Sequence, residues 1–200
     1  MINTIIFDFG DIFINLNKEK SFEAFRKLGL NCLNEKLLLL NCEFEKGKIS
    51  EAAFLGGFTE FIPNASLGEI KEAWNSIIGE FPLYRLEFLQ LLKSKYRLFL
   101  LTNTDMIHIE NFEEKVGISF FSAFYQCFEK VYYSYEMGMR KPDEGIFKYI
   151  IKKHDLNPAK TLFIDDKIEN TDAAISVGLN VWNLQVGFED VVELFDKKVL

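Results

Sequence analysis

Polar residues follow three short apolar runs of the sequence. Asp8 follows "TIIF", Thr102 and Asn103 end "RLFLLTN", and Asp165 and Asp166 end "TLFIDD". Continuous apolar runs of this length are typical of parallel strands that are buried on both faces. The carboxyl ends of such strands share one edge of the sheet, and ligands bind there near the point where the strand order reverses. We therefore expect these residues to meet in one crevice.

The residue types in this set suit phosphoryl transfer. A carboxylate such as Asp8 can accept a phosphoryl group as an acyl phosphate, which divides one difficult transfer into two easier steps. Three carboxylates in one crevice repel each other and need a counter-charge. Mg²⁺ prefers carboxylate and phosphate oxygens and orients the transferring group for in-line attack. Lys141, in "GMRKPD" (138–143), would add a fixed positive charge.

Helical patterns separate the apolar runs. The segments 106–117, 143–155 and 168–178 are helix-like, and 130–137 and 180–185 are candidate further strands. Alternation of strands and helices predicts an α/β fold, namely a Rossmann-like open parallel sheet core with helices on both faces.

One long segment interrupts this alternation. Residues 16–83 are helical in pattern throughout, with Ser50 and Ser66 as expected helix N-termini, and Ser66 with Glu69 fits a capping box. A stripe of phenylalanines at helical spacing indicates core packing: Phe54, Phe58 and Phe61. We predict a core domain formed by residues 1–15 and 84–200 and an inserted small helical cap domain at 16–83.

Composition narrows the function classes. The 200 residues contain 48% hydrophobic and 26% charged residues, as in ordinary globular proteins. A net charge of −7 argues against binding of nucleic acid or anionic membranes and is compatible with a small anionic substrate. Three cysteines (Cys32, Cys42 and Cys127) cannot all pair, and no signal peptide or membrane-spanning run is apparent. We expect reduced, mostly buried thiols in a cytoplasmic protein that is a monomer or weak homodimer.

Four ordered motifs carry a resemblance to a known family. "IIFDFGDIFI", "LLTNT", "GMRKPDEGIF" and "FIDDKIENTDAA" resemble the motifs of the haloacid dehalogenase-like (HAD) hydrolase superfamily. The small-capped phosphatase branch, with members of the alpha-glucose-1-phosphate phosphatase type, is the most similar part of it. "FEKGKISEAAF" also resembles the cap of that branch. The resemblance implies a Mg²⁺-dependent phosphatase that hydrolyses a small phosphorylated metabolite, with sugar phosphates as candidates, through an aspartyl-phosphate intermediate.

The resemblance also implies residue roles. Asp8 corresponds to the nucleophile and a metal ligand, and the Gly10 main-chain carbonyl to a second ligand. Asp166 corresponds to the direct metal carboxylate and Asp165 to the neighbour that acts through water. Four further residues complete the implied site: Thr102 and Asn103 as the phosphate-binding pair, Lys141 as the positively charged residue that pairs with nucleophile and phosphate, and Asn170 as support for the acidic loop.

The sequence departs from the family at one position. Most of its phosphatases have Asp two places after the nucleophile as general acid and base, and Gly10 stands there. Asp11 can replace that acid only if the loop turns its side chain back, since on extended backbone it points to the opposite face. Asp also tolerates a left-handed turn, and we interpret Asp11 as such a turn residue.

Two alternatives to a phosphatase remain. Loss of the acid could mark a catalytically weak phosphate- or metabolite-binding protein. A 2-haloacid dehalogenase also uses an Asp nucleophile, but it needs no metal and has a bulky aromatic residue where this chain has Gly10. The retained nucleophile, lysine and acidic pair favour the phosphatase.

The missing acid leads to a first prediction. Leaving groups of low pKa need little protonation, so a sugar C1 phosphate should be the least affected by its absence. Purified protein should therefore hydrolyse a hexose 1-phosphate faster than a simple alkyl phosphate such as ethyl phosphate, as measured by release of inorganic phosphate. Equal rates on the two substrates would contradict this expectation.

Overall fold

The computed structural model describes residues 1–197 and 199–200. Five parallel strands form one sheet in the order β3-β2-β1-β4-β5. Their bounds are β1 Thr4–Phe7, β2 Arg97–Thr102, β3 Lys130–Tyr133, β4 Thr161–Asp165 and β5 Asn180–Asn183. The order reverses at β1, because β2 and β3 extend the sheet on one side and β4 and β5 on the other. The predicted α/β fold is confirmed.

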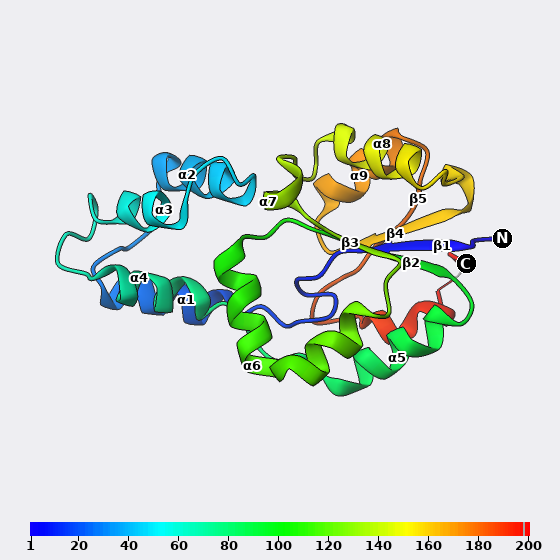
Figure 1. The fold of residues 1–200 in the computed structure, drawn as a ribbon, viewed down its shortest axis with the longest axis horizontal. Coiled ribbons are helices and arrows are strands. Elements are labelled where there is room, and N and C mark those ends of the chain that lie inside the picture. Colours follow the sequence, from blue (N-terminus) through cyan, green and yellow to red (C-terminus); the bar gives the residue numbers. More distant parts are fainter. Residues whose placement is uncertain (198) are drawn as a thin grey trace.

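Helices cover both faces of this sheet (Figure 1). One face carries α5 (Leu83–Lys93), α6 (Met106–Tyr125) and the short η2 (Val191–Phe195). The other carries α8 (Glu144–Lys153) and α9 (Ile168–Ser176). Because side chains alternate along a strand, Ile5 and Phe7 pack on the first face and Ile6 on the second, and all three are fully buried. Burial on both sides explains the continuous apolar runs.

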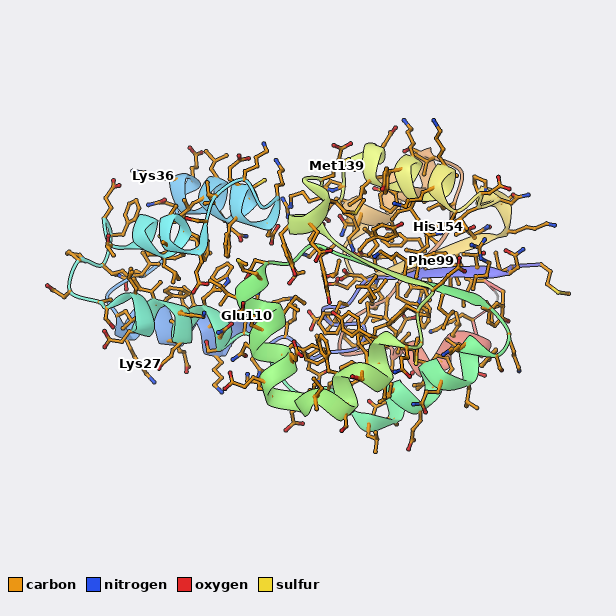
Figure 2. All side chains as sticks on the ribbon, in the orientation of Figure 1. Lys27, Lys36, Phe99, Glu110, Met139 and His154 are labelled. Carbon is orange, nitrogen blue, oxygen red and sulfur yellow. The ribbon has the colours of Figure 1, made fainter. Side chains whose placement is uncertain are left out.

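Four helices form a separate group beyond the carboxyl ends of the strands (Figure 1). They are α1 Lys18–Lys27, α2 Glu35–Glu45, α3 Glu51–Phe58 and α4 Leu67–Asn75. Ser50 caps α3, and the predicted capping box of Ser66 and Glu69 begins α4. The group has its own apolar cluster, in which Phe54 and Phe58 are buried and Phe61 packs at the margin. Figure 2 shows side chains filling its interior, with Lys27 and Lys36 on its outer surface.

Two extended segments connect this helical group to the sheet. The Asn15 N–H donates to Glu80 O (2.9 Å), the Asn17 N–H to Ile77 O (2.7 Å) and the Gly79 N–H back to Asn15 O (2.9 Å). A Cβ on Gly79 would lie 2.4 Å from Asn15 O, so only glycine allows this approach of the two backbones. The crossing lies at the predicted boundaries near residues 15 and 84, and the division into two domains remains a prediction.

Arg85, at the start of α5, holds the chain that follows β1. Its guanidinium donates to Phe13 O (3.1 Å) and Asn15 Oδ1 (2.9 Å) and pairs with Asp190 (2.8 Å). Burial opposes ionisation of Asp190, but the hydrogen bonds from Arg85 and Tyr84 outweigh it and lower its pKa. The loop after the first strand is therefore fixed by a residue 70 positions away in sequence.

Some expected elements differ in detail. Only the first half of 130–137 is strand, because the chain turns at Ser134 into the short helix α7 (Ser134–Met137). Helix α6 continues beyond 117 through a kink at Gly117, whose φ of 77° is not helical. A short turn, η1 (Pro158–Lys160), precedes β4. Cys32 is exposed, contrary to the expectation of mostly buried thiols. Among the described residues, no helix is long and apolar enough to span a membrane.

Candidate active site

Strand ends bring the predicted acidic residues together. Asp8 directly follows β1, and its N–H donates to Ile164 O of β4 at 2.9 Å. Asp165 is the last residue of β4, and Asp166 follows it. One carboxylate oxygen from each of the three aspartates lies within 4.8 Å of the others. Residues separated by more than 150 positions thus form one cluster because β1 and β4 are neighbours.

Lys141 lies between two of these carboxylates. Its Nζ donates to Asp8 Oδ1 at 2.7 Å and to Asp165 Oδ2 at 2.6 Å, and its side chain is 1% exposed. The Asn103 side chain holds the Lys141 backbone with two hydrogen bonds, from Nδ2 to Lys141 O (2.8 Å) and from the Lys141 N–H to Oδ1 (2.9 Å). Asn103 therefore positions the lysine, in addition to any contact of its N–H with a ligand.

The two adjacent aspartates have different surroundings. Asp165 is fully buried and accepts hydrogen bonds from Lys141, from the Asn170 amide (3.0 Å to each oxygen) and from the Lys167 N–H (2.8 Å). Asp166 is partly exposed, and its backbone carbonyl accepts from Asn183 (3.0 Å) while its carboxylate has no hydrogen bond to the described residues. The first carboxylate is committed to the protein, and the second is available to a ligand.

Burial and mutual repulsion shift the pKa values in the cluster. Burial raises the pKa of Asp8 to about 6, with Lys141 opposing the shift and Asp165 and Asp166 adding to it. Burial and the neighbouring Asp165 charge also raise the pKa of Asp166. The pKa of Lys141 is raised because the two carboxylates outweigh its burial. One lysine does not balance three carboxylates, so the cluster favours a further cation.

These residues fit the predicted Mg²⁺. A hard divalent cation takes oxygen ligands, and the cluster offers the free carboxylate of Asp166 and the Asp8 oxygen that Lys141 does not contact. The Gly10 carbonyl belongs to the loop directly after Asp8. Asp165 already accepts several protein hydrogen bonds, which suits the indirect role predicted for it. The ligand roles of these four residues remain predictions.

The backbone of the loop after Asp8 sets the orientation of the Asp11 side chain. The φ of Asp11 is 57°, in the left-handed region. Its carboxylate accepts from the Leu16 N–H (2.9 Å) and from Lys18 Nζ (2.7 Å). A Cβ placed on Gly10 would lie 2.9 Å from Leu16 Cδ1, so the leucine occupies the space beside this glycine. The structure supports the interpretation of Asp11 as a turn residue that anchors the loop.

Thr102 ends β2 and is 3% exposed. With Gly10, Asn103 and Lys167 it lines one end of a cavity of about 420 Å³ that extends between the sheet and the helical group. All predicted site residues lie at this edge of the sheet: Asp8, Gly10, Asp11, Thr102, Asn103, Lys141, Asp165, Asp166 and Asn170. Their roles in binding and catalysis remain predictions.

Two residues near the site were missed from sequence. Lys18 pairs with Asp11, and its charge also acts on Asp166. Asp105 is 1% exposed, caps α6 through the His108 N–H (3.0 Å) and accepts from Trp74 Nε1 of α4 (3.0 Å). An Asp immediately before a helical pattern is an N-cap signal that could have identified Asp105. No local pattern marks Lys18.

The raised pKa of Asp8 predicts a pH-dependent stability cost in metal-free protein. Its folded pKa of about 6 exceeds the ordinary 3.8, so the unfolded chain binds fewer protons between these values and stability falls as pH rises through them. Asp8→Asn should raise the free energy of unfolding near pH 7.5 by about 1–3 kcal/mol, and this gain should vanish near pH 4. Urea unfolding in EDTA at both pH values measures it.

The control is Asp172→Asn, an exposed position of α9, which should change stability by less than about 0.5 kcal/mol at either pH. An equal gain from Asp8→Asn at both pH values would contradict the electrostatic explanation.

Comparisons with known proteins agree with this geometry. A family model described as haloacid dehalogenase-like hydrolase matches residues 2–178. The chain is 28% identical over 193 residues to the D-ribitol-5-phosphate phosphatase of Bacteroides thetaiotaomicron, with 94% of each chain covered. A sesquiterpene phosphatase of Aspergillus oryzae is 40% identical over 55 residues, which is 28% of each chain.

A solved structure of a HAD family enzyme has the same fold as this chain. The wild-type HAD family enzyme BT-2542 from Bacteroides thetaiotaomicron, in complex with magnesium and inorganic phosphate, superimposes with a TM-score of 0.86 and 35% identity, covering 98% of this chain and 100% of that one. The family match extends over most of the chain, from β1 through α9. The chain therefore belongs to the haloacid dehalogenase-like hydrolases.

Proposed function

We propose that this protein is a Mg²⁺-dependent phosphatase that hydrolyses a small phosphorylated metabolite through a phosphoryl group on Asp8. One observation carries the proposal: Lys141 Nζ lies within 2.7 Å of both Asp8 and Asp165, beside the unbonded carboxylate of Asp166. This arrangement supplies a nucleophile, a fixed cation and oxygen ligands for a divalent ion at one sheet edge. The solved relative bound to magnesium and phosphate supports it.

The residues account for both halves of the reaction. A carboxylate oxygen of Asp8 attacks phosphorus, and the bond from phosphorus to the leaving oxygen breaks. Bound Mg²⁺ would neutralise charge on the phosphoryl group. Thr102 and the Asn103 N–H are proposed to donate to its equatorial oxygens, while Lys141 stabilises the charge that develops there. The leaving oxygen takes a proton from solvent. Water then attacks phosphorus, the bond from phosphorus to the Asp8 oxygen breaks, and a proton passes to solvent, which releases inorganic phosphate and regenerates the Asp8 carboxylate.

We propose that α1–α4 act as the small cap of the predicted phosphatase branch. Arg140, which follows α7, pairs with Glu45 of α2 at 2.8 Å, so α2 contacts the segment that carries Lys141. A cap over the crevice contacts the leaving group and excludes water. We also propose a cytoplasmic location and a monomeric or weakly dimeric state. The three cysteines are free thiols in the structure.

The relatives differ in their leaving groups. One is named for a pentitol phosphate and another, matched over a short segment, for a sesquiterpene phosphate. The names of the relatives therefore cover both polar and apolar leaving groups, and a sugar phosphate is one candidate substrate among them.

The alternatives have less support. A dehalogenase has no use for the metal, yet Asp166 presents a free carboxylate to the crevice. A weak binding protein would share the same residues, and only turnover distinguishes it from a phosphatase.

Phosphate release tests the proposal. A panel of sugar phosphates, nucleotides and FMN should give turnover with Mg²⁺ and none with EDTA. Asp8→Asn should lower kcat by at least about 10³, as expected for loss of a covalent nucleophile, whereas Asp172→Asn should retain wild-type activity. Metal-independent turnover, or full activity of Asp8→Asn, would refute the proposal, and binding without turnover would favour the binding protein.

A second prediction concerns the missing acid. With 4-substituted phenyl phosphates, wild-type kcat/KM should fall steeply as the pKa of the phenol rises, because no side chain protonates the leaving oxygen. Gly10→Asp combined with Leu16→Ala, which clears the adjacent space, should raise kcat/KM for the poorest leaving group by about 10². Gly10→Asn with Leu16→Ala is the matched control. An equal gain in that control would rule out proton transfer as the cause.

A further inference from the structure

The cavity that begins at Thr102 has a mainly apolar wall. Five large apolar side chains come from the helical group (Phe22, Phe25, Leu30, Leu33 and Trp74), and Ile77 comes from the segment that follows α4. Leu16 and Ile78, on the two connecting segments, continue this wall toward Gly10. Its volume of about 420 Å³ is within the range of small-molecule sites. The wall therefore offers a surface for hydrocarbon next to the phosphate-binding residues.

We propose that this cavity binds the leaving group of the substrate, and that the substrate is a phosphate monoester whose leaving group is mainly hydrocarbon. The inference rests on the proposed phosphatase function and names its substrate class. Gly10, Thr102 and Asn103 line this cavity together with the apolar side chains, so a phosphate held by these residues has the apolar wall beside it.

The polar side chains on the wall are largely occupied by other parts of the protein. Ser21 Oγ donates to Ala73 O (3.2 Å), and Lys18 pairs with Asp11 (2.7 Å). His108 contacts Trp74 O through Nε2 (3.1 Å) and Asp105 through Nδ1 (3.1 Å). Each of these groups already has a partner in the protein, and the exposed Lys18 ammonium is the one that can donate further hydrogen bonds to a ligand.

Two further polar residues of the lining lie on α2, and Cys32, Thr104 and Lys167 lie on other segments. Glu45 pairs with Arg140 at 2.8 Å, but its buried Oε2 accepts no hydrogen bond from the described residues. Asn41 Oδ1 is buried and accepts no hydrogen bond from the described residues. It can accept from one hydroxyl or N–H of the leaving group. The wall thus suits a hydrocarbon that carries at most a few polar groups.

This balance disfavours a polyol. Each hydroxyl that leaves water without a protein partner costs free energy, whereas each buried methylene gains it. A polyol phosphate would place several hydroxyls against Phe22, Leu33 and Trp74. An alkyl or isoprenoid phosphate of similar length would bury its chain there.

A matched pair of substrates tests the inference. Hexyl phosphate and sorbitol 6-phosphate are both six-carbon primary phosphate monoesters and differ in the hydroxyls of the chain. With Mg²⁺, kcat/KM should be at least tenfold higher for hexyl phosphate. From ethyl to butyl to hexyl phosphate it should rise by up to about fourfold per buried methylene.

Two leucine variants locate the effect. Leu33 lines the cavity and is 44% exposed, whereas Leu39, on α2 and 68% exposed, does not line it. Leu33→Gln should lower kcat/KM for hexyl phosphate by about fivefold and leave that for ethyl phosphate unchanged. Leu39→Gln should change neither. Both side chains are exposed, so both variants should fold.

Binding gives a readout that does not need turnover. Calorimetric titration with hexylphosphonate and methylphosphonate should give a Kd at least tenfold lower for the longer chain. Its binding heat capacity should also be more negative, as expected for buried apolar surface.

The outcomes separate the two proposals. Faster hydrolysis of sorbitol 6-phosphate, or no dependence on chain length in turnover and binding, would overturn the hydrocarbon site while leaving a phosphatase. Absence of phosphate release from every substrate would refute the phosphatase, and the phosphonate titration would still decide whether the cavity selects hydrocarbon.

Discussion

The Lys141 ammonium, buried between Asp8 and Asp165, is the interaction on which the site depends. Removing an ammonium group from water is costly unless opposite charges compensate for it closely. Two carboxylates at 2.6–2.7 Å provide that compensation. In turn the lysine keeps the two aspartates together, although they belong to different strands. Loss of Lys141 would leave two buried carboxylates without a counter-charge, so the lysine fixes the positions of both.

Several features of the fold serve this arrangement. The reversal of strand order at β1 places Asp8 and Asp165 on neighbouring strand ends. The side chain of Asn103, at the end of β2, holds the backbone of Lys141. Asn170, in the first turn of α9, holds the carboxylate of Asp165. Each neighbour of the cluster is anchored to a regular element, so little reorganisation is needed when a ligand binds.

The excess of negative charge around Lys141 favours binding of a divalent cation. Burial raises the pKa of Asp8, and the adjacent Asp166 adds to this shift. A divalent cation relieves the same repulsion that makes the metal-free site costly. The repulsion that lowers the stability of the metal-free protein is thus the same interaction that favours binding of metal and phosphate. The cavity next to the charged cluster is lined mainly by apolar side chains.

The sequence by itself determined the α/β fold, the presence of a helical group within residues 16–83 and the identity of the clustered acids, but not the extended backbone between α4 and α5. It could do so because these depend on periodicity and on residues at strand ends, which are local patterns. The tertiary structure decided the direction of Asp11, which depends on a left-handed backbone and on contacts with Leu16 and Lys18. It also decided the character of the cavity, because side chains such as Phe22 of α1 and Trp74 of α4 meet there only after distant helices pack together. Local sequence patterns do not encode contacts between residues that are distant along the chain, because those contacts follow from the topology of the fold.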